Sequence, residues 1–166
     1  MSRFLWIEDF ENGTQTPTEF LWGNYLPQSF QIPDDSEALV ELLDEHGIIL
    51  KLDFWSGWEF IQKNLKEVDY IILDVDLEIG GKKENLLEIL KKYNYKPPYE
   101  NQEEDKRKYR DALKELKKIA GYQLYLELVF EKSFPKQHIL FSTNHLGELN
   151  SIREAFSTAK LNLPPL

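Results

Sequence analysis

Acidic side chains directly follow two apolar segments of this 166-residue chain. In "YIILDVDLEI" the apolar run stops at Asp74, and Asp76 follows two residues later. In "RFLWIEDF" the apolar run stops at Glu8 and Asp9. A carboxylate at the tip of a buried strand is costly unless something there uses it. A hard divalent cation takes oxygen ligands, so Glu8, Asp9 and Asp74 are candidate Mg²⁺ ligands.

These acids need a scaffold that brings them together, and the hydrophobic pattern indicates one. Nearly continuous apolar runs predict buried strands at residues 3–7, 48–54, 69–75 and 138–143. Amphipathic patterns predict helices at residues 36–46, 56–66, 121–132 and 147–160, and residues 12–18 have the composition of a turn. Strands that alternate with helices predict an α/β domain in which helices cover both faces of a parallel sheet.

The carboxyl ends of parallel strands form one edge of the sheet, where sites in such folds usually lie. The fourth expected strand ends in Ser142, Thr143 and Asn144. Polar groups from three strands should therefore meet at this edge. The hydroxyl of Thr143 is placed to donate a hydrogen bond to a phosphoryl group on Asp74.

Residues 79–120 interrupt the alternation of strands and helices. Their two halves each carry apolar residues at helical spacing, and Pro97-Pro98 separates them because a helix does not continue through this pair. We expect an inserted helical hairpin that begins and ends beside Asp74. Such a hairpin would be either a surface decoration or an element that partly covers the site and binds a partner.

Composition excludes several classes of protein. The net charge is −9, which disfavours binding to nucleic acid, and the absence of cysteine excludes disulfides and thiolate metal sites. The sequence contains neither an apolar run of membrane-spanning length nor a signal peptide. These features predict a single cytoplasmic domain, 1–166, that does not interact with membranes.

Three segments together resemble the receiver domain of response regulators. "RFLWIEDF" resembles its first strand with the acidic pair. "SGWEFIQKNLKEVDYIILDVDL" resembles the stretch that ends in the phosphorylated aspartate, and "AGYQLYLELVFEKSFPKQHILFSTN" resembles the third helix and fourth strand. The matches keep their order and cover most of the chain outside 10–35 and 79–120.

The resemblance implies a flavodoxin-like three-layer fold and a role in two-component signalling. It assigns Asp74 as the phospho-acceptor and Thr143 as the switch hydroxyl. It implies a Mg²⁺ ion held by Asp9 directly, by Glu8 through water and by the backbone carbonyl of Asp76. Its partners would be a histidine kinase or phosphotransfer protein, or a protein effector, and any catalysis would be limited to phosphorylation and dephosphorylation of the domain itself.

The chain departs from the family pattern after the fourth strand. Receivers have a fifth strand that ends in a lysine, whereas this chain has only "AKLNLPPL" at its end. Lys160 falls within the last expected helix and lies too close to Thr143 to serve as that lysine. The acidic pair also begins with Glu8 instead of an aspartate. A four-stranded sheet leaves an open edge, so we expect a homodimer or further protein beyond residue 166.

Other functions remain open on the sequence. A receiver-like domain without phosphorylation would serve as a protein-interaction module. Haloacid-dehalogenase-like phosphatases share the apolar run followed by "DVD" and an "STN" segment, but they need a lysine and further acids downstream, and no acidic pair of that kind follows Asn144. Toprim-type nucleases combine a glutamate such as Glu8 with a later Asp74/Asp76 pair, and both enzyme classes would use Mg²⁺.

Overall fold

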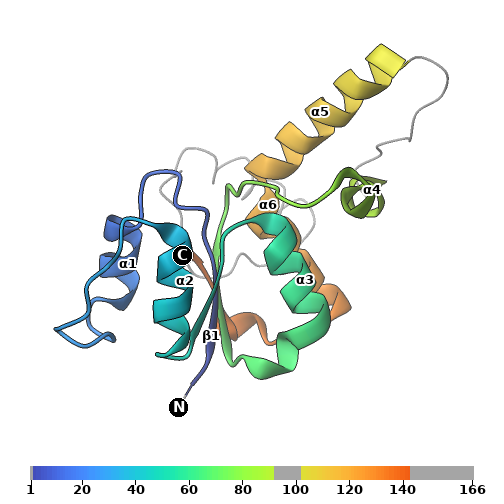
Figure 1. Cartoon of the computed structure of the whole chain (residues 1–166). Helices are drawn as coiled ribbons and strands as arrows, with labels where there is room; N and C mark the ends of the chain where they lie inside the picture. The colour runs from blue at the N-terminus through green and yellow to red at the C-terminus, as the bar shows by residue number, and fades with distance from the viewer. Residues whose placement is uncertain (1, 92–101, 143–166) are drawn as a thin grey trace.

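Four short parallel strands form the centre of the protein in the computed structural model, which describes residues 2–91 and 102–142. The strands are β1 (Phe4–Ile7), β2 (Ile48–Lys51), β3 (Tyr70–Asp74) and β4 (Ile139–Ser142), in the order β2-β1-β3-β4. Helices lie on both sides of the sheet, as Figure 1 shows. The predicted α/β fold with a parallel sheet is therefore confirmed.

The first face of the sheet is covered by α1 (Gln15–Trp22) and α2 (Ser36–Asp44). Side chains alternate along a strand, so Trp6 of β1 points to this face between two residues that point to the other. Trp6 is fully buried and its ring lies against Phe10 and Trp22. Asp35 begins α2, because its carboxylate accepts hydrogen bonds from two backbone N–H groups of the first turn.

The second face is covered by α3 (Phe54–Asn64) and α6 (Ala120–Leu126). A short 3₁₀ turn, η1 (Leu65–Glu67), follows α3. The π-helical segment η2 (Glu127–Glu131) extends α6, and the 3₁₀ turn η3 (Lys136–His138) leads into β4. Leu5 and Ile7 of β1 and Leu73 of β3 are fully buried beneath these helices.

The inserted segment contains α4 (Lys83–Lys91) and α5 (Gln102–Lys118), so its two halves are helical as predicted. Leu86, Ile89 and Leu90 of α4 and Leu116 of α5 are buried in the same cluster as α3 and α6. The helix α5 points away from the sheet, and its last turn lies next to α6 (Figure 1). The insertion is thus anchored to the domain by α4 and by the carboxyl end of α5.

Several predicted boundaries differ from the observed ones. Part of the expected turn 12–18 belongs to α1, and the expected strand 48–54 ends at Lys51. Phe54 is buried but belongs to α3, which begins there because the Asp53 carboxylate accepts a hydrogen bond from the Ser56 N–H at 2.7 Å. The expected helix 147–160 and the residue Thr143 lie outside the described residues. No helix within the described ranges is long and apolar enough to cross a membrane.

Candidate metal centre

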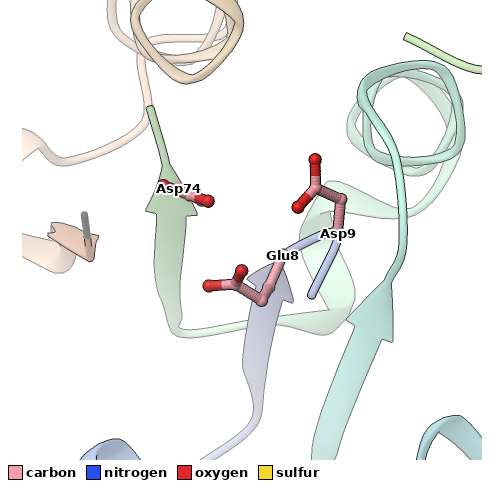
Figure 2. A group of neighbouring side chains, drawn as sticks. All are labelled: Glu8, Asp9 and Asp74. Atoms are coloured by element: carbon pink, nitrogen blue, oxygen red, sulfur yellow. The ribbon is translucent and has the colours of Figure 1, made fainter. Parts of the chain in front are cut away.

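The carboxyl ends of β1 and β3 are neighbours in the sheet, since Ile7 pairs with Leu73. Glu8 and Asp9 follow the first of these residues and Asp74 follows the second. Each of the three acids offers a carboxylate oxygen that lies within 4.8 Å of those offered by the other two. Figure 2 shows the three side chains gathered at the ends of the two strands. The structure therefore brings together the three acids that the sequence singled out.

Glu8 is the buried member of the group, with 7% of its surface exposed. Burial and the neighbouring charge of Asp74 raise the pKa of Glu8 from 4.5 to about 8, and a hydrogen bond shared with Asp74 adds to this shift. One Oε atom of Glu8 also accepts a hydrogen bond from the Phe10 N–H at 3.3 Å, which favours the charged form. Near neutral pH, Glu8 therefore holds a proton next to Asp74.

Asp9 is held in place by the backbone on two sides. Its Oδ1 accepts a hydrogen bond from the Glu11 N–H at 3.1 Å, and its Oδ2 accepts one from the Glu78 N–H at 2.7 Å. Each carboxylate oxygen has two acceptor positions, so both can still bind a cation. These bonds fix Asp9 relative to the segment that follows β3.

The segment 75–79, which follows β3, is tied to three other parts of the chain. The N–H groups of Phe54 and Trp55, at the start of α3, donate to the carbonyls of Glu78 and Ile79 at 2.8 and 2.9 Å. The Leu77 N–H donates to the Lys117 carbonyl at 3.3 Å, and the Gly121 N–H donates to the Val75 carbonyl at 3.0 Å. The segment is therefore held in one conformation beside Asp74 by α3, α5 and α6.

Asp76 lies half-buried within segment 75–79. Its negative charge contributes to raising the pKa of Lys117, so its carboxylate lies within electrostatic reach of that ammonium group. At the neighbouring strand, Asp74 pairs in register with Ser142 of β4. The serine that ends β4 is thus placed level with Asp74, while Thr143 lies outside the described residues.

Two residues near the site escaped the sequence analysis, namely Glu78 and Lys117. The Lys117 ammonium forms ion pairs with the carboxylates of Glu78 and, at 3.9 Å, Glu11. No local pattern indicates this contact, because Lys117 is one of many charged residues on α5 and its partners lie far away in the sequence. Only the docking of α5 onto segment 75–79 reveals it.

The chemistry of the donor set fits Mg²⁺. All three groups are carboxylates, two of them are half-exposed and reachable, and hard divalent cations prefer such oxygen ligands. A cation would also offset the charge of Asp74, which together with burial raises the pKa of Glu8. Glu8, Asp9 and Asp74 would hold the ion, and the Asp76 carbonyl is the further ligand that the receiver resemblance implies.

No protein-family model, curated protein or solved structure matches this chain.

Proposed function

We propose that this protein is a receiver-like signalling domain that accepts a phosphoryl group on Asp74 with the help of Mg²⁺. The observation that carries the proposal is the convergence of Glu8, Asp9 and Asp74 at the carboxyl ends of two adjacent parallel strands. The order of these acids along the chain and their place in the sheet agree with the phosphorylation site of a receiver, although Glu8 stands where that family usually has an aspartate.

The strand order gives independent support. The order β2-β1-β3-β4 corresponds to the first four strands of the flavodoxin-like arrangement. In that arrangement the chain changes direction across the sheet between β1 and β3, and ligands bind outside the carboxyl ends of these strands. Glu8, Asp9 and Asp74 come from those two strand ends, so we assign the domain to the flavodoxin-like class.

Asp74 is the nucleophile in this proposal. One of its carboxylate oxygens forms a bond to the phosphorus atom of the donor, the bond between phosphorus and the leaving group breaks, and an acyl phosphate remains on Asp74. Bound Mg²⁺ supplies positive charge that offsets the charge of the phosphoryl oxygens. The Val75 N–H donates to Asp74 Oδ1 at 2.6 Å and orients the carboxylate. A histidine kinase or phosphotransfer protein would be the donor, and a protein effector would read the result.

Phosphorylation by acetyl phosphate tests the proposal directly. In the presence of Mg²⁺ we expect the intact protein to gain the mass of one phosphoryl group in a hydroxylamine-labile form. Asp74→Asn should abolish this gain completely, because the amide is not a nucleophile for phosphorus. Asp44→Asn is the control, since Asp44 is exposed and ends α2, where it pairs with Arg3 ahead of β1, at the opposite edge of the sheet.

Titration with Mg²⁺ and beryllofluoride completes this test. Beryllofluoride imitates a phosphoryl group, so it should bind the wild-type protein only when Mg²⁺ is present. Binding of Mg²⁺ without any labelling of Asp74 would contradict phosphotransfer and leave only a metal site. Failure of Mg²⁺ to bind at millimolar concentration would contradict the metal site as well.

One observation favours a second candidate, a protein-interaction module that is not phosphorylated. The raised pKa of Glu8 lets a proton reduce the repulsion between Glu8 and Asp74 near neutral pH, so the acids can coexist without a cation. In this case α4 and α5 would present a binding surface, and the acidic group would be a remnant of the receiver pattern. The absence of Mg²⁺ binding is the result that would select this candidate.

A further inference from the structure

The last turn of α5 is attached to the segment that carries the acidic site. Its Lys117 carbonyl accepts the Leu77 N–H, and a few residues later the Gly121 N–H donates to the carbonyl of Val75. The rest of α5 extends away from the sheet (Figure 1). A force or a partner acting on the projecting part of α5 would therefore reach the site through this attachment.

The side chain of Lys117 strengthens the attachment and lies among acids that orient the site. It forms ion pairs with Glu78 and Glu11, the two residues whose N–H groups hold the carboxylate of Asp9. The charges of Glu78, Asp76 and Glu11 all act to raise its pKa. Lys117 thus carries a positive charge at the border of a strongly negative region.

A divalent cation at the acidic site and the ammonium of Lys117 repel each other, although different carboxylates attract them. The cation would be held by Glu8, Asp9 and Asp74, whereas Lys117 pairs with Glu78 and Glu11. Within the described residues, the ion pairs of Glu78 and Glu11 are with Lys117 alone. The repulsion acts at the edge of the protein over a short range, where water screens it only in part. The two cations therefore compete electrostatically although they occupy different positions.

We infer that the inserted helix α5 regulates the acidic site through Lys117. With α5 docked, the ammonium lowers the affinity of the site for a divalent cation. By thermodynamic reciprocity, a bound cation weakens the docking of the last turn of α5 by the same factor. A partner that draws α5 away would raise the affinity. The inference rests on the metal site proposed above, and Lys117 acts as a positioning residue.

Isothermal titration calorimetry with Mg²⁺ on the full chain tests the inference, because the inference fixes the direction in which the Mg²⁺ affinity should change. Lys117→Gln should bind Mg²⁺ roughly three- to tenfold more tightly than the wild type, because one nearby positive charge is lost. Lys117→Arg keeps the charge and should restore wild-type affinity. Lys118→Gln is the matched control, since Lys118 pairs with Glu115 within α5 itself and should have little effect.

Hydrogen exchange gives a second readout that does not depend on activity. In the wild type, Mg²⁺ should accelerate exchange in residues 113–118, whereas in Lys117→Gln this part of α5 should respond little to the ion. If Lys117 had a purely structural role, Lys117→Gln would instead weaken Mg²⁺ binding, because segment 75–79 would be loosened.

The possible outcomes separate the two proposals. If Lys117→Gln binds Mg²⁺ with unchanged or lower affinity, the regulatory inference is wrong and the metal site stands. If neither the wild type nor any variant binds Mg²⁺, the metal site is wrong and the inference falls with it. Tighter binding in Lys117→Gln, restored by Lys117→Arg, would support both.

Discussion

Glu8→Gln is expected to make the protein more stable at alkaline pH, even though Glu8 belongs to the candidate site. The side chain is buried next to Asp74, and its pKa in the folded protein is about 8 instead of 4.5. Glutamine has the shape of the protonated acid. Its Oε1 can accept the Phe10 N–H, and its Nε2 can donate to Asp74, so the packing and hydrogen bonds of Glu8 should be preserved.

The direction of the pH dependence follows from the proton count of the folded and unfolded states. Below pH 4.5 both states hold the proton on Glu8, and its contribution to stability is fully present. Between pH 4.5 and about 8 only the folded state holds it, so stability falls as the pH rises. Above about pH 8 neither state holds it and the contribution is lost. The free energy of unfolding that is lost between pH 4.5 and about 8 is on the order of 5 kcal/mol.

Urea-induced unfolding of the wild type and Glu8→Gln, over a pH series that spans 4.5 to 8, measures this effect. The difference in unfolding free energy should be small at the acidic end and should grow in favour of the variant as the pH rises. Glu59→Gln is the control, because Glu59 is half-exposed on α3 and pairs with Lys63 of the same helix. A constant difference across the series would show that the pKa of Glu8 is not raised.

The same comparison reports on the cation. Mg²⁺ should stabilise the wild type at alkaline pH, because it binds the folded state and offsets the charge of the deprotonated Glu8. It should stabilise Glu8→Gln less, since the neutral amide is a poorer ligand. Equal stabilisation of the two proteins would place the ion away from Glu8.

The grouping of the three acids could be predicted because it depends on few assumptions. Two apolar runs, each followed by acids, suffice to place Glu8, Asp9 and Asp74 at one edge of a parallel sheet. The alternation of strands and helices fixes this edge without any knowledge of long-range contacts. The predicted centres of the four strands were therefore right, although the length of β2 was not.

Boundaries were less predictable where turn-forming residues also start helices. Gly13, Thr14 and Pro17 suggest a turn, but Pro17 lies in the first turn of α1, where the missing N–H does no harm. The apolar Phe54 fits the pattern of a longer β2, yet the Asp53 carboxylate caps α3 at this point. In both cases the residue types permit two structures, and packing onto the sheet selects the helix.

The contacts of Lys117 could not be predicted, since they arise from the docking of a separate helix. Its partner Glu78 lies 39 positions earlier in the chain, and the intervening insertion has no counterpart in the receiver pattern. The expectation that the insertion returns beside Asp74 was right, as the bond from the Gly121 N–H to the Val75 carbonyl shows. The sequence pattern does not determine which charged residue of α5 faces the site, because this depends on how the helix docks onto segment 75–79.

Gly121→Ala is expected to have two effects with one cause: it should destabilise the protein and distort the candidate site. Gly121 starts α6 against the backbone of β3, and an added Cβ would lie 2.0 Å from the Asp74 carbonyl oxygen and 3.0 Å from the Val75 Cα. These are backbone atoms, so they cannot rotate away as a side chain would. The strand end and α6 would have to separate, at a cost of about 1–3 kcal/mol or more.

Thermal unfolding and Mg²⁺ titration of Gly121→Ala measure the two consequences. The melting temperature should fall, and the affinity for Mg²⁺ should fall with it, because the Asp74 backbone must shift relative to Glu8 and Asp9.

Gly13→Ala is the control. Gly13 has a φ of +90°, so alanine there is strained, but nothing lies within 4 Å of an added Cβ. Gly13→Ala should therefore lower the melting temperature but leave the Mg²⁺ affinity of the folded protein unchanged. Unchanged Mg²⁺ affinity in Gly121→Ala would mean that the position of Asp74 does not determine cation binding, which would remove Asp74 from the ligand set.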